Sequence, residues 1–157
     1  MSKRQSIASS LFPSSGRLVI YADGGARGNP GPAAIGILVG SRKYGEVIGN
    51  TTNNVAEYKA VIFALKKAKQ LLGKKNSRQT ELQINTDSEL LYKQVKGQNK
   101  ILEPELQTLF IEVWNLLQDF KAVEFKKIPR EENKAADRLM NQALDKSESG
   151  ENRGRLL

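Results

Sequence analysis

Apolar and polar positions alternate, or apolar positions run continuously, in five short segments that predict β-strands. Three of these segments lie near the start of the chain, at 17–23, 33–39 and 44–50, and glycine-rich links separate them. Because the links are short, we expect the three strands to pair antiparallel. Two later segments, at 81–87 and 122–128, predict a fourth and a fifth strand.

Helical spacing of apolar residues fills most of the sequence between these strands. It predicts helices over 53–72, 88–96 and 131–146, and a further helix that begins at Pro104. Glycines at positions 73 and 97 end the first two of these helices. The basic segment 74–78 is expected to be a loop.

Three strands followed by alternating helices and strands predict one α/β domain over 17–146, with a mixed sheet covered by helices. The length of 157 residues suits a single domain. Residues 1–16 contain several serines and no acidic residue, and we expect a flexible tail there, with a transit peptide as the alternative. Residues 147–157 are expected to form a flexible C-terminal tail.

The amino-acid composition limits the kinds of partner and metal ligand that the protein can have. The 25 Lys and Arg residues outnumber the 17 Asp and Glu residues, and the net charge of +8 favours a polyanionic partner, although a membrane surface or a ribosomal partner is also compatible. No apolar run approaches the ~20 residues that cross a bilayer, so we expect no membrane insertion. The sequence contains neither cysteine nor histidine, which excludes disulfides and leaves oxygen ligands, the type that suits Mg²⁺ or Mn²⁺.

Four carboxylates stand where an acidic side chain is unexpected. Asp23 and Asp87 end predicted strands, Glu57 lies in the first turn of a core-facing helical stripe, and Asp137 borders the apolar face of the last helix. Each has an ordinary explanation as a turn residue, a helix cap, a partner of the helix dipole or a solvated side chain. Together they point to a metal-dependent nuclease.

The sequences around these carboxylates carry the more specific signal. Asp23 opens a segment rich in glycine and proline, 23–32, which a plain hairpin would not require. The second motif is Asn53-Asn54-Val55-Ala56-Glu57, where an asparagine is expected to cap the helix. The remaining two are Asn85-Thr86-Asp87-Ser88 and Asn133-Lys134-Ala135-Ala136-Asp137.

With these four motifs in this order, the chain resembles type 1 ribonuclease H over roughly residues 17–144. The resemblance implies a ribonuclease H-like five-stranded sheet of order 3-2-1-4-5, and hydrolysis of the RNA strand of RNA/DNA hybrids to 5′-phosphate and 3′-hydroxyl ends. It also implies two Mg²⁺ ions, or Mn²⁺ in their place. Asp23 and Asp87 would bridge both ions, with Glu57 on one and Asp137 on the other.

The resemblance further implies a set of substrate contacts that read 2′-hydroxyls in the minor groove. These contacts are the backbone or side chains of Gly24, Gly25, Gly28, Asn29, Asn53, Asn54 and Ser88. For the asparagines, turn formation and helix capping are the alternative roles.

Two departures from the family pattern bear on mechanism. Many members carry a histidine in the loop before the last aspartate, whereas here that loop, 127–133, offers Arg130 or Glu132 as the replacement. Some members also insert a basic helix after the short helix, and the segment 97–103 is too short for it. The candidates to contact phosphates instead are Lys93, Lys96, Lys100, Lys126 and Lys127.

Two other functions stay open at this point. One is a catalytically silent nucleic-acid-binding module, because a fold does not fix activity. The other is a nuclease of the same fold that acts on double-stranded RNA or a DNA end. We expect a cytoplasmic monomer that binds an RNA/DNA hybrid.

Overall fold

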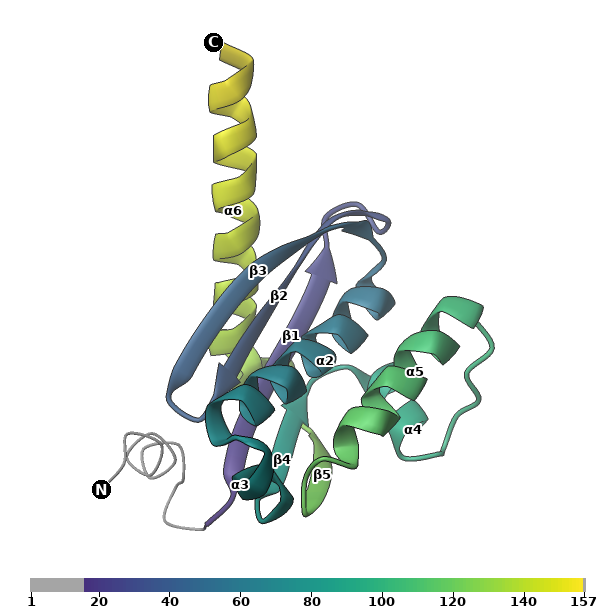
Figure 1. The fold of residues 1–157 in the computed structure, drawn as a ribbon. Helices are drawn as coiled ribbons and strands as arrows, with labels where there is room; N and C mark the ends of the chain where they lie inside the picture. The colour runs from purple at the N-terminus through teal and green to yellow at the C-terminus, as the bar shows by residue number, and fades with distance from the viewer. Residues whose placement is uncertain (1–15, 157) are drawn as a thin grey trace, which may run out of the picture.

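A five-stranded mixed sheet with the strand order β3-β2-β1-β4-β5 forms the centre of the molecule (Figure 1). The computed structural model describes residues 16–156, so the tail predicted at 1–16 lies, but for Gly16, outside the described residues. The strands are β1 (Leu18–Ala26), β2 (Gly31–Val39), β3 (Arg42–Thr51), β4 (Glu81–Thr86) and β5 (Ala122–Lys127). The first three pair antiparallel, and β4 lies parallel between β1 and β5, which confirms the predicted topology.

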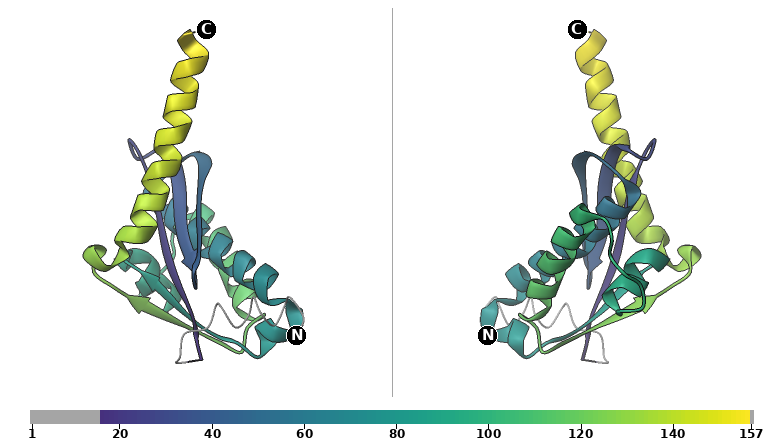
Figure 2. Two further views of the ribbon diagram at one scale, coloured as in Figure 1. Left: turned by 90° about the vertical axis from the view of Figure 1, so that its left-hand side faces the viewer. Right: turned by 90° about the vertical axis from the view of Figure 1, so that its right-hand side faces the viewer.

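Helices cover both faces of the sheet (Figure 2). On one face α2 (Asn53–Leu72) packs on β1 and β2, and α5 (Pro104–Leu117) packs on α2. On the other face α6 (Lys134–Leu156) crosses β1, β2 and β3. The shorter elements are α3 (Lys74–Arg78), α4 (Glu89–Val95) and the 3₁₀ helix η1 (Arg130–Asn133).

A stripe of small side chains brings α2 close to the sheet. Buried alanines recur along this stripe every four residues, the spacing that keeps side chains on one helical face. They are Ala56, Ala60, Ala64 and Ala68. A methyl group at Gly24 of β1 would contact the carbonyl oxygen of Ala56, so backbone meets backbone there. The close packing places Glu57, the residue after Ala56, beside the end of β1.

Two glycines allow an equally close approach of α6 on the other face. A methyl group at Gly36 of β2 would contact the carbonyl oxygen of Ala136, and one at Gly45 of β3 would contact that of Leu139. The first turns of α6 therefore lie directly against the strands. Asp137, which follows Ala136, is held next to the sheet by this packing.

The glycine-rich segment after Asp23 is a shorter turn than the sequence predicted. β1 continues past Asp23, because Gly24, Gly25 and Ala26 pair with Ile35, Ala34 and Ala33 of β2. The hairpin therefore closes over 27–30, where the Arg27 N–H donates to the carbonyl of Pro32 at 2.8 Å. Small residues on both strands permit this extension of the ladder.

Two further predicted boundaries are wrong. The segment 74–78, expected to be a loop, is the helix α3, in which the hydroxyl of Ser77 donates to the carbonyl of Gly73 at 2.7 Å. The last helix continues to Leu156, past the predicted end at 146 and through most of the expected flexible tail. Arg27 forms an ion pair with Asp145 at 2.8 Å, just before the predicted end, and one with Glu148 of the extension at 2.9 Å.

The close approach of α6 gives a stability prediction. Gly36→Ala should lower the free energy of unfolding by about 1–3 kcal/mol or more, because the new methyl group overlaps the backbone of α6. Gly150→Ala is the matched control: it lies in α6 with open space around it, and should be neutral or stabilising by up to about 1 kcal/mol. Urea denaturation measures both, and equal stabilities for the two variants would contradict the packing described.

Candidate active site

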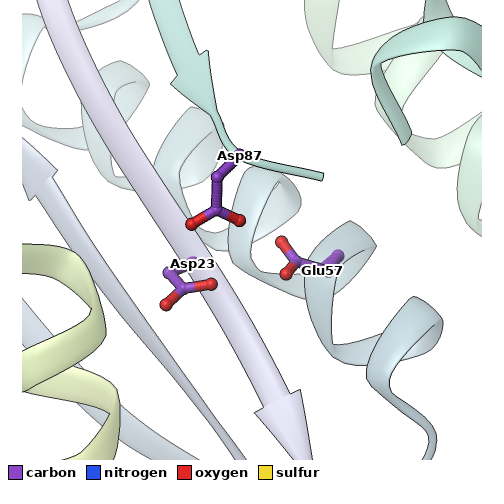
Figure 3. Close-up of side chains that lie close together, drawn as sticks. All are labelled: Asp23, Glu57 and Asp87. Atoms are coloured by element: carbon purple, nitrogen blue, oxygen red, sulfur yellow. The ribbon is translucent and has the colours of Figure 1, made fainter. Parts of the chain in front are cut away.

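Two aspartates meet where β1 and β4 stop pairing. The parallel ladder between these strands ends at Ala22 and Thr86, so Asp23 and Asp87 are the next residues on two adjacent strands. Glu57 reaches the same point from the first turns of α2. Figure 3 shows the three carboxylates turned toward one another, and each has an oxygen within 4.8 Å of the other two.

A set of hydrogen bonds fixes the start of α2 and with it Glu57. Thr52, not an asparagine as expected, caps the helix: its hydroxyl accepts from the N–H of Val55 at 3.3 Å. The side-chain oxygen of Asn53 accepts from the N–H of Ala26 at 2.8 Å, and that of Asn29 accepts from the N–H of Asn53 at 2.9 Å. These bonds tie α2 to the β1–β2 turn.

Burial and mutual repulsion raise the proton affinity of this cluster. The side chain of Asp23 is only 6% exposed, and burial, together with Asp87 and Asp137 nearby, raises the pKa of Asp23 to about 7. Burial, and then the charges of Asp23 and Asp87, raise the pKa of Glu57 well above its usual value. Two carboxylates about 4 Å apart repel by ~4 kcal/mol at an effective dielectric constant of ~20. A bound cation would offset this repulsion.

The fourth predicted carboxylate lies in the same cleft but outside the tight cluster. Asp137 comes from α6 and lines a cleft of about 420 Å³ together with Asp23, Glu57 and Asp87. It is close enough to Asp23 to contribute to the raised pKa of that residue. The structure therefore brings together all four predicted carboxylates, three of them in mutual contact range.

The cleft separates the expected substrate contacts into two groups. Five line it: Gly24, Gly25, Asn53, Asn54 and Ser88. The other two, Gly28 and Asn29, lie in the β1–β2 turn and are not part of the cleft wall. Of the two candidates to replace the loop histidine, Arg130 lines the cleft and Glu132 does not.

Two of these side chains also carry structural bonds. The side-chain oxygen of Asn53 accepts from the Ala26 N–H, as described above, and the Ser88 hydroxyl caps α4 by accepting from the N–H of Leu91 at 3.2 Å. Capping and turn formation, the alternative roles considered for these residues, are therefore present in the structure. The bond of Asn53 uses its side-chain oxygen, so its NH₂ group can still donate, and Asn53 lines the cleft.

Sequence reasoning assigned no role to two residues at this site, although Asn133 opens the last of the four motifs. Arg27 lines the cleft and is held on α6 by Asn141, Asp145 and Glu148. The spacing of these three residues along the last helix places them on one face, and the sequence shows this spacing. The sequence does not show that Arg27 is their partner. Asn133 is buried and its side-chain amide donates to the Ala22 carbonyl at 3.0 Å and to the Asp87 carboxylate at 3.3 Å.

The residues of the cluster fit a hard divalent cation. Asp23, Glu57 and Asp87 offer carboxylate oxygens close enough together to hold a metal ion. Oxygen donors of this kind suit Mg²⁺ and Mn²⁺. Burial and the neighbouring carboxylates raise the pKa of Asp23 and that of Glu57, and a bound cation would favour the charged form of both groups. Among the helices of the described chain, none is long and apolar enough to span a membrane.

The chain is similar to known proteins over most of its length. A family model described as "Reverse transcriptase-like" matches residues 22–143. The chain is 38% identical over 136 residues to "Ribonuclease HI" of Halobacterium salinarum, covering 83% of this chain and 65% of that protein. It is also 38% identical over 136 residues to "Bifunctional protein Rv2228c" of Mycobacterium tuberculosis, covering 82% of this chain and 36% of that protein.

Among solved structures, the chain is similar to LC11-RNase H1 in complex with an RNA/DNA hybrid. The two are 40% identical with a TM-score of 0.79, and the match covers 83% of this chain and 99% of that one. The chain thus spans nearly all of this structure but only about a third of the mycobacterial relative.

The raised pKa of Asp23 gives a prediction about pH. A carboxyl group with a higher pKa in the folded protein binds more protons when folded, so its stabilising contribution is complete below pH 3.8 and is lost as the pH rises toward about 7. Asp23→Asn carries no such charge. In EDTA, the free energy of unfolding of this variant relative to that of the wild type should rise by on the order of 2–4 kcal/mol between pH 4 and pH 8.

Urea denaturation of both proteins at the two pH values measures this gain. Addition of Mg²⁺ at pH 8 should shrink it, because the cation neutralises the repulsion in the wild type but has fewer carboxylates to bind in the variant. If the stability difference between the two proteins stays constant from pH 4 to pH 8, the pKa of Asp23 is not raised by folding.

Proposed function

The chain belongs to the type 1 ribonuclease H family, and from that membership we propose that it hydrolyses the RNA strand of RNA/DNA hybrids. The observation that carries the proposal is the convergence of Asp23, Glu57 and Asp87 from β1, α2 and the end of β4. A silent binding module has no chemical reason to keep closely spaced carboxylates that repel one another.

In this proposal four carboxylates would hold the metal. Asp23, Glu57 and Asp87, with Asp137 on the cleft wall, would supply the oxygen ligands for two Mg²⁺ ions. When bound, two such ions activate water for in-line attack on a phosphodiester and stabilise the leaving oxygen, which gives 5′-phosphate and 3′-hydroxyl ends. The protein's own contribution is to fix the carboxylates on a rigid sheet edge and a packed helix, so that little reorganisation is needed.

The wall of the cleft around the carboxylates selects the substrate. Gly24 and Gly25 have no side chain to keep the nucleic-acid backbone away, and the amides of Asn53 and Asn54 and the hydroxyl of Ser88 offer hydrogen bonds. Groups of this kind distinguish RNA from DNA by contacting 2′-hydroxyls. The hybrid-bound state of the similar LC11-RNase H1 supports this choice of substrate.

Arg130 takes the place of the missing loop histidine in this proposal. It lines the cleft as the first residue of η1, and its guanidinium can pair with a phosphate through two parallel hydrogen bonds. Glu132 lies outside the cleft and is the weaker of the two candidates. The proposal also takes the protein to be a cytoplasmic monomer.

The proposal is tested by incubating end-labelled RNA/DNA hybrid, double-stranded RNA and double-stranded DNA with the protein, in Mg²⁺ and in EDTA. We expect cleavage of the RNA strand of the hybrid, in Mg²⁺ only. Preferential cleavage of double-stranded RNA would identify the other nuclease function. Binding of hybrid with no cleavage of any substrate would identify the silent module.

Removal of one carboxylate should abolish activity and leave the fold intact. Asp87→Asn keeps the shape of the side chain but loses its charge, and should lower the cleavage rate by roughly three orders of magnitude, about 4 kcal/mol of barrier. Asp119→Asn makes the same chemical change at an ion pair with Lys69, and should cleave at close to the wild-type rate. Single-turnover rates and circular dichroism check both variants, and a near-normal rate for Asp87→Asn would remove Asp87 from the mechanism.

Binding of the hybrid should weaken with salt. Exposed lysines lie just after α4 and at the end of β5, namely Lys96, Lys100, Lys126 and Lys127. Each phosphate contact they make adds about 0.7–0.9 to the log–log slope of affinity against salt concentration. Lys96→Ala with Lys100→Ala should therefore give a shallower slope, measured by fluorescence anisotropy with catalytically inactive protein.

Lysines on the helix that precedes β4 serve as the control. Lys74 and Lys75 lie on α3, next to the start of β4 (Figure 1), whereas Asp87 of the cleft follows the end of that strand. Replacing both by alanine removes the same charge and should leave the slope unchanged. Equal slopes for the two double variants would place the nucleic acid elsewhere or make the salt effect one of net charge.

A further inference from the structure

Asn133 is a buried polar side chain that contacts the carboxylate cluster. It ends η1, is 1% exposed, and its amide nitrogen donates to the Ala22 carbonyl at 3.0 Å and to the Asp87 carboxylate at 3.3 Å. Ala22 is the last residue of β1 in the β1–β4 ladder, and Asp87 is the first residue past the end of β4. A single amide therefore spans the point where the two strands separate.

The orientation of this amide is fixed by its partners. Both partners are acceptors, so the NH₂ group must face them, because a flipped amide would bring its oxygen against a carbonyl and a carboxylate. The side-chain oxygen of Asn133 is consequently left buried with no hydrogen-bond partner among the described residues. An unpaired buried acceptor destabilises the fold. An asparagine at this position therefore lowers the stability relative to an apolar side chain of similar size. This cost indicates that its NH₂ group has a further role.

We propose that Asn133 is a positioning residue that sets the direction of the Asp87 carboxylate for cation binding, an inference that rests on the proposed function. Asp87 needs such support because it follows the last paired residue of β4, so the sheet ladder does not hold it. The N–H group of Asn133 holds one carboxylate oxygen of Asp87, and the Ala22 carbonyl holds the amide in turn. Hydrogen bonds of this kind to a ligating carboxylate tune metal affinity.

A second buried asparagine offers a matched comparison. Asn85 is 2% exposed, and its amide nitrogen donates to the Ile20 carbonyl of β1 at 3.2 Å. Its side-chain oxygen accepts from the amide of Gln83 at 3.0 Å, so it is satisfied. Asn85 and Asn133 thus both bond a carbonyl of β1, but only Asn133 bonds a carboxylate. Replacing Asn85 therefore measures how much a hydrogen bond to a β1 carbonyl contributes to stability alone.

The test compares Asn133→Leu with Asn85→Leu, which preserve approximate volume and remove the amide. Calorimetry of Mg²⁺ binding to the protein without nucleic acid should show a loss of affinity of roughly tenfold or more for Asn133→Leu and wild-type affinity for Asn85→Leu. Thermal unfolding in EDTA should show the larger loss for Asn85→Leu, because the change at position 133 also removes the unpaired oxygen.

Cleavage kinetics give a second readout. Asn133→Leu should lower kcat at subsaturating Mg²⁺ with the KM for hybrid nearly unchanged, and higher Mg²⁺ should restore part of the rate. Wild-type Mg²⁺ affinity in Asn133→Leu, or equal losses in the two leucine variants, would overturn the positioning role and leave a structural one.

A second variant keeps the inference testable if Asn133→Leu does not fold. Asn133→Ser is smaller and polar, but its hydroxyl is too short to reach both partners, so it should fold and bind Mg²⁺ more weakly than the wild type. Wild-type Mg²⁺ affinity in this variant would overturn the inference. Because Mg²⁺ binding is measured without substrate, a protein that binds the ion normally but cleaves no hybrid would contradict the proposed function and leave the role of Asn133 intact.

Discussion

Repulsion among closely spaced carboxylates is the central physical problem that this fold has to solve. Asp23, Glu57 and Asp87 would separate if they were free to move, since each lies within reach of two like charges. The fold prevents this by placing two of them on adjacent strands of one sheet and the third on a helix packed on that sheet. A divalent cation relieves this repulsion when it binds. It also binds more tightly because the fold has already brought the carboxylates together.

Close packing of backbone against backbone makes the assembly rigid. Gly24 lets α2 lie against β1, and Gly36 and Gly45 let α6 lie against β2 and β3. Glu57 and Asp137 each follow a residue of these contacts, so neither carboxylate sits on a flexible loop. Asp87 is the exception, because it follows the end of β4, and there the buried amide of Asn133 supplies the missing support.

The sequence was sufficient for the parts of the site that follow from local pattern. Asp23 and Asp87 end apolar runs, and parallel neighbours bring such ends together, so their meeting was predictable once the motifs indicated the strand order. Long-range pairings were not predictable in this way. The extension of β1 depends on its register with β2, and the continuation of α6 coincides with Arg27 reaching three side chains more than a hundred residues away. Local composition suggested a turn where β1 continues and a flexible tail where α6 continues.

The account is tested most directly by locating the cations. Crystals grown with Mn²⁺ above pH 7 would allow the metal to be identified by anomalous scattering. We expect two anomalous peaks in the cleft, both next to Asp23 and Asp87, with Glu57 at one and Asp137 at the other, at metal–oxygen distances of roughly 2.0–2.3 Å. An intact cleft with no anomalous peak among these four carboxylates, at Mn²⁺ concentrations that support cleavage, would contradict the central claim that their repulsion is balanced by divalent cations.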